Sequence, residues 1–137
     1  MRLWHKSLIH YLPRQQLISQ WRECCCIAKN IKEKGTPNHV LVNPIMNYPI
    51  EHFIAYTYLV AIEMTSRGYD CNRSKFAQHF KQGWDKYVIL FSDIFKEWHN
   101  DRYLKQCLYN LQEKADRGAI PKEEWIKIEN HFTQGEF

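Results

Sequence analysis

A single carboxylate in the first quarter of the chain stands among uncharged hydrogen-bonding side chains. Glu23 lies in the segment LPRQQLISQWRECC. On a helix, at about 100° per residue, three polar side chains fall within about 60° of it: Gln16, Ser19 and Gln20. Arg22 borders this face. A carboxylate in such surroundings can stabilise a cationic intermediate or transfer protons. The alternative is an Arg–Glu surface pair, which stabilises a fold only slightly.

Other sequence motifs for catalysis are missing. The chain has no glycine-rich phosphate loop, no nucleophile elbow and no Cys-x-x-Cys pair. The consecutive Cys24, Cys25 and Cys26 point in three directions on a helix, so they cannot bind one metal ion together. The seven His show no His-x-x-x-His spacing. We therefore expect neither a metal ion nor a cofactor.

Positive charge is concentrated near the start of the chain. Residues 1–34 contain seven Lys or Arg and two Glu, a net charge of +5. The remaining residues contain twelve basic and thirteen acidic side chains. This asymmetry suggests a polyanionic partner. A solvated basic surface is the alternative explanation.

The elements that must position Glu23 are helical. Five Gly and five Pro in 137 residues are few, which favours helices over a turn-rich β protein. Apolar spacings of three and four, bounded by Gly and Pro, predict an N-terminal arm and six helices: the arm at 1–12, then helices at 13–30, 49–68, 74–81, 84–98, 101–114 and from 121 onward, with an ordered loop at 36–48. We expect a compact all-α bundle, one domain over residues 1–137, with the arm packed on it.

The sequence gives weaker indications of location. No apolar run reaches the roughly 18 residues of a membrane span, and the start of the chain lacks the apolar region of a signal peptide. The five Cys are interpreted as reduced thiols. We therefore expect a cytoplasmic monomer that does not bind membranes.

The chain resembles the pyrimidine-dimer DNA glycosylase/AP lyase family, the phage and bacterial endonuclease V-type excision enzymes. The resemblance is good over residues 1–30, fair over 48–70 and weak beyond. It rests on Met1-Arg2-Leu3, Gln15, Leu17, Arg22-Glu23, His52-Phe53, Glu63 and Arg67-Gly68-Tyr69. It implies an all-α enzyme that excises damaged pyrimidines from duplex DNA and cleaves the abasic site.

In that family a free N-terminal amine attacks the sugar, expels the base and forms an imine. By resemblance, Glu23 is the essential carboxylate, Arg22 contacts the nucleotide or a phosphate, and Arg2 neighbours the nucleophile. The phage enzyme exposes a Thr amine, whereas Arg2 here disfavours Met removal. Either Arg2 replaces that Thr and its amine is blocked, or Met1 is retained as the nucleophile, which we favour. A free α-amine has a pKa of about 7.7–8.0, against about 10.4 for Lys, so it forms an imine more readily.

Basic and aromatic residues alternate along the same stretch. Phosphate contacts by Lys and Arg and base stacking by Trp or His would suit DNA binding. The expected DNA contacts are Arg2, Trp4, His5, Lys6, Arg14, Gln15, Gln16, Arg22 and Lys29. Trp4 has a second interpretation, as a core anchor. His39 either approaches DNA or caps a turn, and the sequence does not decide which.

Two other functions remain open from sequence. One is a catalytically silent DNA-binding relative, suggested by the Met1-Arg2 start. The other is a small helical protein-interaction domain, suggested by the lack of basic excess after residue 34. Salt-insensitive failure to bind duplex DNA would favour the second.

Overall fold

A computed structural model describes residues 1–80 and 89–132, and every regular element in these ranges is a helix. The prediction of an all-α fold is confirmed, and no strand occurs in the described ranges. The elements in chain order, with η marking 3₁₀ helices, are η1 (Lys6–Tyr11), α1 (Arg14–Lys34), η2 (Asn43–Asn47), α2 (Ile50–Ser66), α3 (Arg73–Ala77), η4 (Phe91–Asp93), α4 (Asp101–Asp116) and α5 (Lys122–Phe132).

Helix α1 carries the predicted catalytic face. It begins directly after Pro13, whose missing N–H is not needed in a first turn. Gly35 ends it in the left-handed conformation (φ 73°), with its N–H donating to the Ile31 carbonyl. The helix therefore ends four residues later than the spacing predicts. It packs on α2, which begins after Pro49 as expected.

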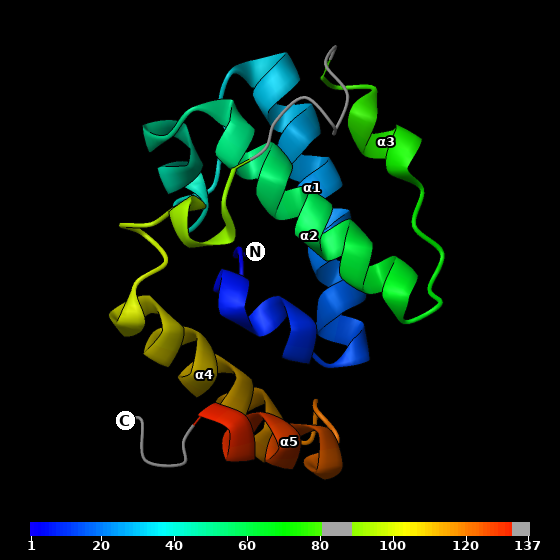
Figure 1. The fold of residues 1–137 in the computed structure, drawn as a ribbon, viewed down its shortest axis with the longest axis vertical. Coiled ribbons are helices and arrows are strands. Elements are labelled where there is room, and N and C mark those ends of the chain that lie inside the picture. The colour runs from blue at the N-terminus through cyan, green and yellow to red at the C-terminus, as the bar shows by residue number, and fades with distance from the viewer. Residues whose placement is uncertain (81–88, 133–137) are drawn as a thin grey trace.

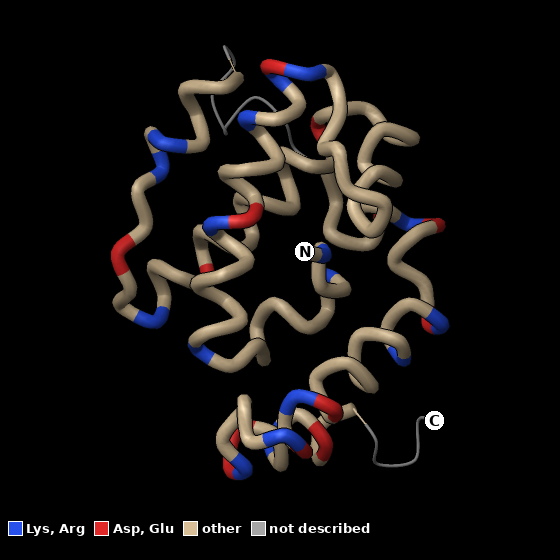
Figure 2. Tube along the Cα trace, turned by 180° about the vertical axis from the view of Figure 1, so that it is seen from behind, with Lys and Arg blue, Asp and Glu red and all other residues tan. Residues whose placement is uncertain are grey.

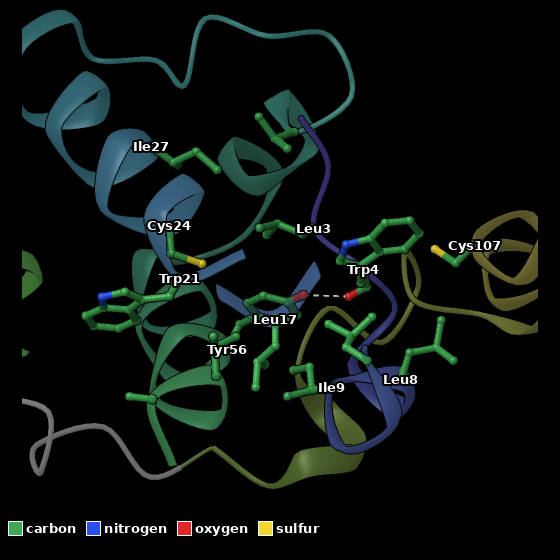
Figure 3. Packing of buried hydrophobic residues seen from close by; sticks show 14 of the residues in the cluster. Leu3, Trp4, Leu8, Ile9, Leu17, Trp21, Cys24, Ile27, Tyr56 and Cys107 are labelled. Atoms are coloured by element: carbon green, nitrogen blue, oxygen red, sulfur yellow. Dashed lines mark hydrogen bonds between the residues drawn. The ribbon is translucent and has the colours of Figure 1, made fainter. Parts of the chain in front are cut away.

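The N-terminal arm runs inside the molecule. Figure 1 shows it between the α1–α2 pair and α4. Its Leu3, Leu8 and Leu12 have at most 1% of their surface exposed. In Figure 3 the arm's Trp4 lies beside Cys107 of α4. The arm is thus a layer of the core between two groups of helices, and burying its apolar side chains fixes where the chain begins.

The second half of the molecule differs most from the sequence-based expectation. A helix over 84–98 is wrong for residues 89–98, which form only η4 and turns, while 84–88 lie outside the described residues. The buried Lys6 ammonium donates hydrogen bonds to the carbonyls of Phe91, Ser92 and Ile94 at 2.8, 3.1 and 2.7 Å. The Phe91 carbonyl also accepts the Ile94 N–H at 3.3 Å, which closes η4, and the helix does not continue beyond Asp93. Phe95 also has φ of 50°, which interrupts any helix.

Smaller differences concern element ends. The helix expected at 74–81 is α3, which ends at Ala77, and the expected loop at 36–48 contains η2. Helix α4 begins at Asp101, where the spacing predicts it, and is capped by Asn100, whose side-chain oxygen accepts the Tyr103 N–H. No helix in the described part of the chain is long and apolar enough to cross a membrane. All five Cys are free thiols.

Candidate active site around Glu23

Glu23 is half-buried on α1 and faces the beginning of the chain. Burial raises the pKa of its carboxyl, because the charged form is desolvated. Four groups oppose this shift: the terminal amine of Met1, a hydrogen bond from the Arg2 backbone, and the charges of His39 and Lys114. A carboxylate, a primary amine and further cationic groups therefore come together from the arm, the loop before η2, and α4.

Gln20 fixes the arm against α1, and its side chain is fully buried. Its Oε1 accepts the Trp4 N–H at 2.8 Å, and its Nε2 donates to the Arg2 carbonyl at 2.9 Å and to Glu23 Oε2 at 3.2 Å. These bonds pair the arm backbone on both sides of Leu3. The amide thus places the first residue of the chain beside the carboxylate.

Tyr56 of α2 joins the hydrogen-bond network of Gln20 and the arm. Its hydroxyl lies 2.6 Å from the Trp4 carbonyl oxygen and 2.9 Å from Gln20 Oε1. A hydroxyl has one proton, so it donates to one of these oxygens at a time. Figure 3 shows the Tyr56–Trp4 bond at the centre of the packed core. Because the core surrounds this network, the arm is held in one position.

Residues after 89 hold the arm from the other side. The Tyr103 hydroxyl donates to the Leu3 carbonyl at 2.5 Å. The Lys6 N–H donates to His99 Nδ1 at 2.9 Å. His5 Nδ1 accepts the Ser7 N–H, so its Nε2 carries the proton and donates to the His99 carbonyl at 2.9 Å. Burial lowers the pKa of His5 to about 4, so it is neutral at pH 7.

The expected DNA contacts fall into two groups in the structure. Trp4, His5 and Lys6 are buried, with 5–7% exposed, so they have almost no surface to offer a nucleic acid. The residues with accessible side chains are on α1: Arg14, Gln15, Arg22 and Lys29 are exposed and Gln16 is half-buried. Arg2 is half-buried, with its guanidinium 5.6 Å from the Trp4 ring centroid.

The charge asymmetry of the sequence does not become one basic face. Figure 2 shows Lys and Arg positions on helices all round the molecule, with Asp and Glu among them, especially at the α4–α5 end. The basic positions of the first 34 residues are divided between the arm and the long α1. The exposed basic positions of this part of the chain are therefore local, on the solvent side of α1.

Sequence reasoning overlooked part of this site. The helical spacing places Gln20 on the same face as Glu23. Its position next to a carboxylate is the sequence feature that could have identified it as part of the site. Nothing in the sequence singled out Tyr103, His99 or Lys114, because they lie where the family resemblance is weak. The structure brings His39 close enough for its charge to act on Glu23, and its Nδ1 accepts the Leu41 N–H at 3.2 Å.

No group of three or more His, Cys, Asp or Glu in the described ranges is arranged to hold a metal ion. The family model for pyrimidine dimer DNA glycosylase matches residues 1–77, more than half of the chain. This match includes Met1, Gln20 and Glu23 and ends with α3. Comparison with curated proteins and with solved structures found no match. With the family shown over this length, the chain belongs to the pyrimidine dimer DNA glycosylases.

Proposed function

We propose that this protein is a DNA glycosylase with abasic-site lyase activity on damaged pyrimidines in duplex DNA, with the Met1 amine as its nucleophile. The observation that carries the proposal is the position of the Met1 amine near Glu23, next to the Gln20 bonds that join the Arg2 carbonyl to this carboxylate. The Met1 amine and Glu23 are called the catalytic pair below. The charge of that amine is the largest influence that opposes the burial of the carboxylate. The family supports glycosylase activity. The position of a primary amine near a carboxylate supports an imine mechanism.

In the first half of the reaction the neutral Met1 nitrogen attacks C1′ of the damaged nucleotide. The C1′–N bond to the base breaks, its electron pair stays with the base, and the base takes up a proton. The attached amine then loses its protons while the sugar ring opens. One proton goes to O4′, and a C1′=N imine forms. Glu23 stabilises the cationic sugar and transfers the proton to O4′.

In the second half Glu23 takes a proton from C2′, and the imine accepts the electron pair. The C3′–O bond then breaks, and the 3′ phosphate leaves with the bonding electrons. Water hydrolyses the remaining imine and releases Met1. The raised pKa of Glu23 suits both roles. A more basic carboxylate accepts the C2′ proton more readily, and the carboxyl can still be protonated when it has to give a proton to O4′. The scheme needs no metal ion or cofactor, since amine and carboxylate supply the nucleophile and the base.

DNA binding is assigned to residues around this pair. Arg14, Arg22 and Lys29 are exposed on α1 and are proposed to contact phosphates, with Gln15 and Gln16 beside them. Arg2 borders the nucleophile. Trp4, His5 and Lys6 are assigned the positioning of the arm instead of direct contact, because they are buried. A monomer in the cytoplasm is the state in which we propose that it acts.

Borohydride trapping tests the proposal. Protein with a native N-terminus is incubated with two labelled duplexes, one with an abasic site and one with a thymine dimer. We expect a covalent adduct on both, mapped to Met1 by peptide mass analysis. The control is the same protein with its N-terminal amine acetylated, which should give no adduct.

The outcomes separate the competing functions. An adduct on the abasic duplex alone indicates a lyase without glycosylase activity. DNA binding without any adduct, with a free N-terminus, indicates a catalytically silent relative. Failure to bind either duplex at low salt contradicts a DNA-directed function and favours the protein-interaction domain.

A further inference from the structure

The turn between α1 and η2 is held rigidly by its own hydrogen bonds. The His39 carbonyl accepts the N–H groups of Val42 and Asn43 at 3.0 and 2.9 Å. The His39 N–H donates to Asn43 Oδ1 at 3.1 Å, and His39 Nδ1 accepts the Leu41 N–H at 3.2 Å. These four bonds close residues 39–43 into one compact unit. Its shape is set before any partner arrives.

This turn presents two branched apolar side chains to solvent. Val40 is 78% exposed and Leu41 is 45% exposed, whereas the next residue, Val42, is completely buried. Ile45 of η2 is buried as well and anchors the turn from below. The hydrophobic effect disfavours such exposure, and a rigid turn cannot fold the side chains back. An apolar tip that is kept outside on a rigid base suits insertion into a partner.

The turn borders the catalytic pair. His39, at its base, is close enough to Glu23 for its charge to act on that carboxylate. On its other side a groove of about 480 Å³ separates Val40 and Leu41 from Trp98 and Tyr103. Tyr103 is the residue whose hydroxyl holds the Leu3 carbonyl. The apolar tip is therefore linked to the arm through Tyr103 and to Glu23 through the charge of His39.

We propose that Val40 and Leu41 form a wedge that enters the base stack of duplex DNA beside the nucleotide on which Met1 acts. The inference rests on the proposed function, since it takes damaged DNA as the partner. Both Arg102 and Glu97 line the groove, so its charge does not indicate the kind of partner. DNA is chosen as the partner because the catalytic pair lies nearby. A base inside a stacked duplex hides its C1′ from an amine, and an inserted apolar side chain unstacks the step.

The two side chains fit this task physically. Val loses little conformational freedom when it is inserted, because its χ1 is already restricted. The turn itself needs no ordering, since its hydrogen bonds are already formed. The wedge thus leaves most of the apolar contact energy available for unstacking. It also places His39 and Glu23 at the opened step.

A binding experiment tests the wedge independently of catalysis. The probe is a duplex with a tetrahydrofuran abasic analogue, which cannot form an imine, and 2-aminopurine as the adjacent base. The test protein carries Val40→Ala and Leu41→Ala together. The matched control is Ile126→Ala on α5, whose side chain is 44% exposed, close to the 45% of Leu41. Both changes are at exposed positions, so both proteins should fold, which thermal unfolding checks.

Wild type and Ile126→Ala are expected to raise 2-aminopurine fluorescence on binding, because the base becomes unstacked. The double variant is expected to lose most of that rise and to cleave the dimer duplex roughly tenfold or more slowly. Its trapping on a single-stranded abasic oligonucleotide should stay at the wild-type level, because little stacking has to be broken. Loss of single-stranded trapping as well would mean that the variant damages the catalytic pair, and would overturn the wedge.

Two other results overturn the proposal. One is a double variant that raises the fluorescence as much as wild type. The other is a wild-type protein that gives no rise when bound at saturation, as expected if the tip docks a protein. If wild type raises the fluorescence but traps no abasic DNA, the wedge stands and the imine mechanism fails.

Discussion

Residues 1–77 and residues 89–132 contribute to one site in different ways. The first region contains the groups with chemistry: the terminal amine, Gln20 and Glu23. The second supplies backbone and side-chain partners that hold the arm, such as His99 and Tyr103. The family match covers only the first region. Figure 1 shows that the arm of the first region lies between the α1–α2 pair and α4.

This difference separates reactivity from position. A reactive amine is useful only when it is held close to its base, because orientation accounts for much of an enzyme's effect. Here the orientation depends on residues that the family match does not reach. The predictions below break one region or the other, from the largest expected effect to the smallest.

Glu23→Gln should remove the chemistry of the first region. Strand cleavage is expected to fall by about 10²–10⁴-fold, the usual contribution of a general acid–base, while DNA affinity is kept. Single-turnover cleavage and a binding titration measure the two. Glu33→Gln, at an exposed position near the end of α1, is the matched control. Cleavage by Glu23→Gln at the Glu33→Gln rate would remove Glu23 from the mechanism.

The same substitution should stabilise the fold at neutral pH. Burial raises the pKa of Glu23 in the folded state above its value in the unfolded state. At pH values between these two, the folded state therefore binds more protons than the unfolded state. Wild-type stability is therefore lost as the pH rises through that range. Glu23→Gln should melt higher than wild type at pH 7, and the difference should shrink below the ordinary Glu pKa. If wild type and Glu23→Gln have the same Tm at both pH values, the burial of the Glu23 charge does not destabilise the fold.

Gln20→Leu should disturb the junction of the two regions. It leaves the Trp4 N–H and the Arg2 carbonyl without the partner seen here. Each buried unpaired group costs about 1–3 kcal/mol. Urea unfolding should show this loss, and adduct formation should slow because the arm is displaced. Gln112→Leu, at a half-buried position on α4, should change neither; if both variants behave alike, Gln20 does not hold the arm.

Tyr103→Phe should loosen the arm from the side of the second region. It removes the hydrogen bond to the Leu3 carbonyl, worth about 0.5–1.5 kcal/mol. Because Tyr103 positions the arm, the rate of borohydride trapping should fall while DNA affinity stays constant. Tyr109→Phe on the same helix, with its side chain 67% exposed, is the control. Trapping by Tyr103→Phe as fast as the control would show that α1 and α2 alone hold the arm.

Lys114→Gln should have the smallest effect, on pH dependence. The charge of Lys114 helps to lower the pKa of Glu23, so its removal raises that pKa. Glu23 must be ionised to accept the C2′ proton, and the acidic limb of the cleavage profile should therefore move to higher pH. Lys122→Gln at the start of α5 is the control. An unmoved acidic limb would mean that the α4 charge does not reach the carboxylate.

Much of the fold could be predicted from local signals. Pro13 and Pro49 precede α1 and α2, and Gly35 ends α1, because these residues act on the backbone nearest to them. Within the expected helix over 84–98, the described residues 89–98 do not form an α-helix, for a non-local reason. Its apolar spacing is helical, but the Lys6 ammonium binds three of its carbonyls from 85 or more residues away. No window of sequence contains that competition.

The candidate site shows the same division. Helical spacing predicted that Glu23 lies beside Gln20, because both residues are on one helix. The buried state of Trp4, His5 and Lys6 could not be read from alternating basic and aromatic residues, which look alike in a binding surface and in a core. Lys6 is buried because three carbonyls replace its water shell. His5 is buried because it stays neutral and hydrogen-bonded.

The sequence by itself determined the helical class, the two proline-initiated helices, the polar face around Glu23 and the family, because each depends on residues close together in the chain. The tertiary structure decided that the arm lies in the core, that the terminal amine lies near enough to Glu23 to act on its charge, and that α4 supplies Tyr103 and Lys114 from about 100 residues away. Such contacts arise only when packing brings distant segments together.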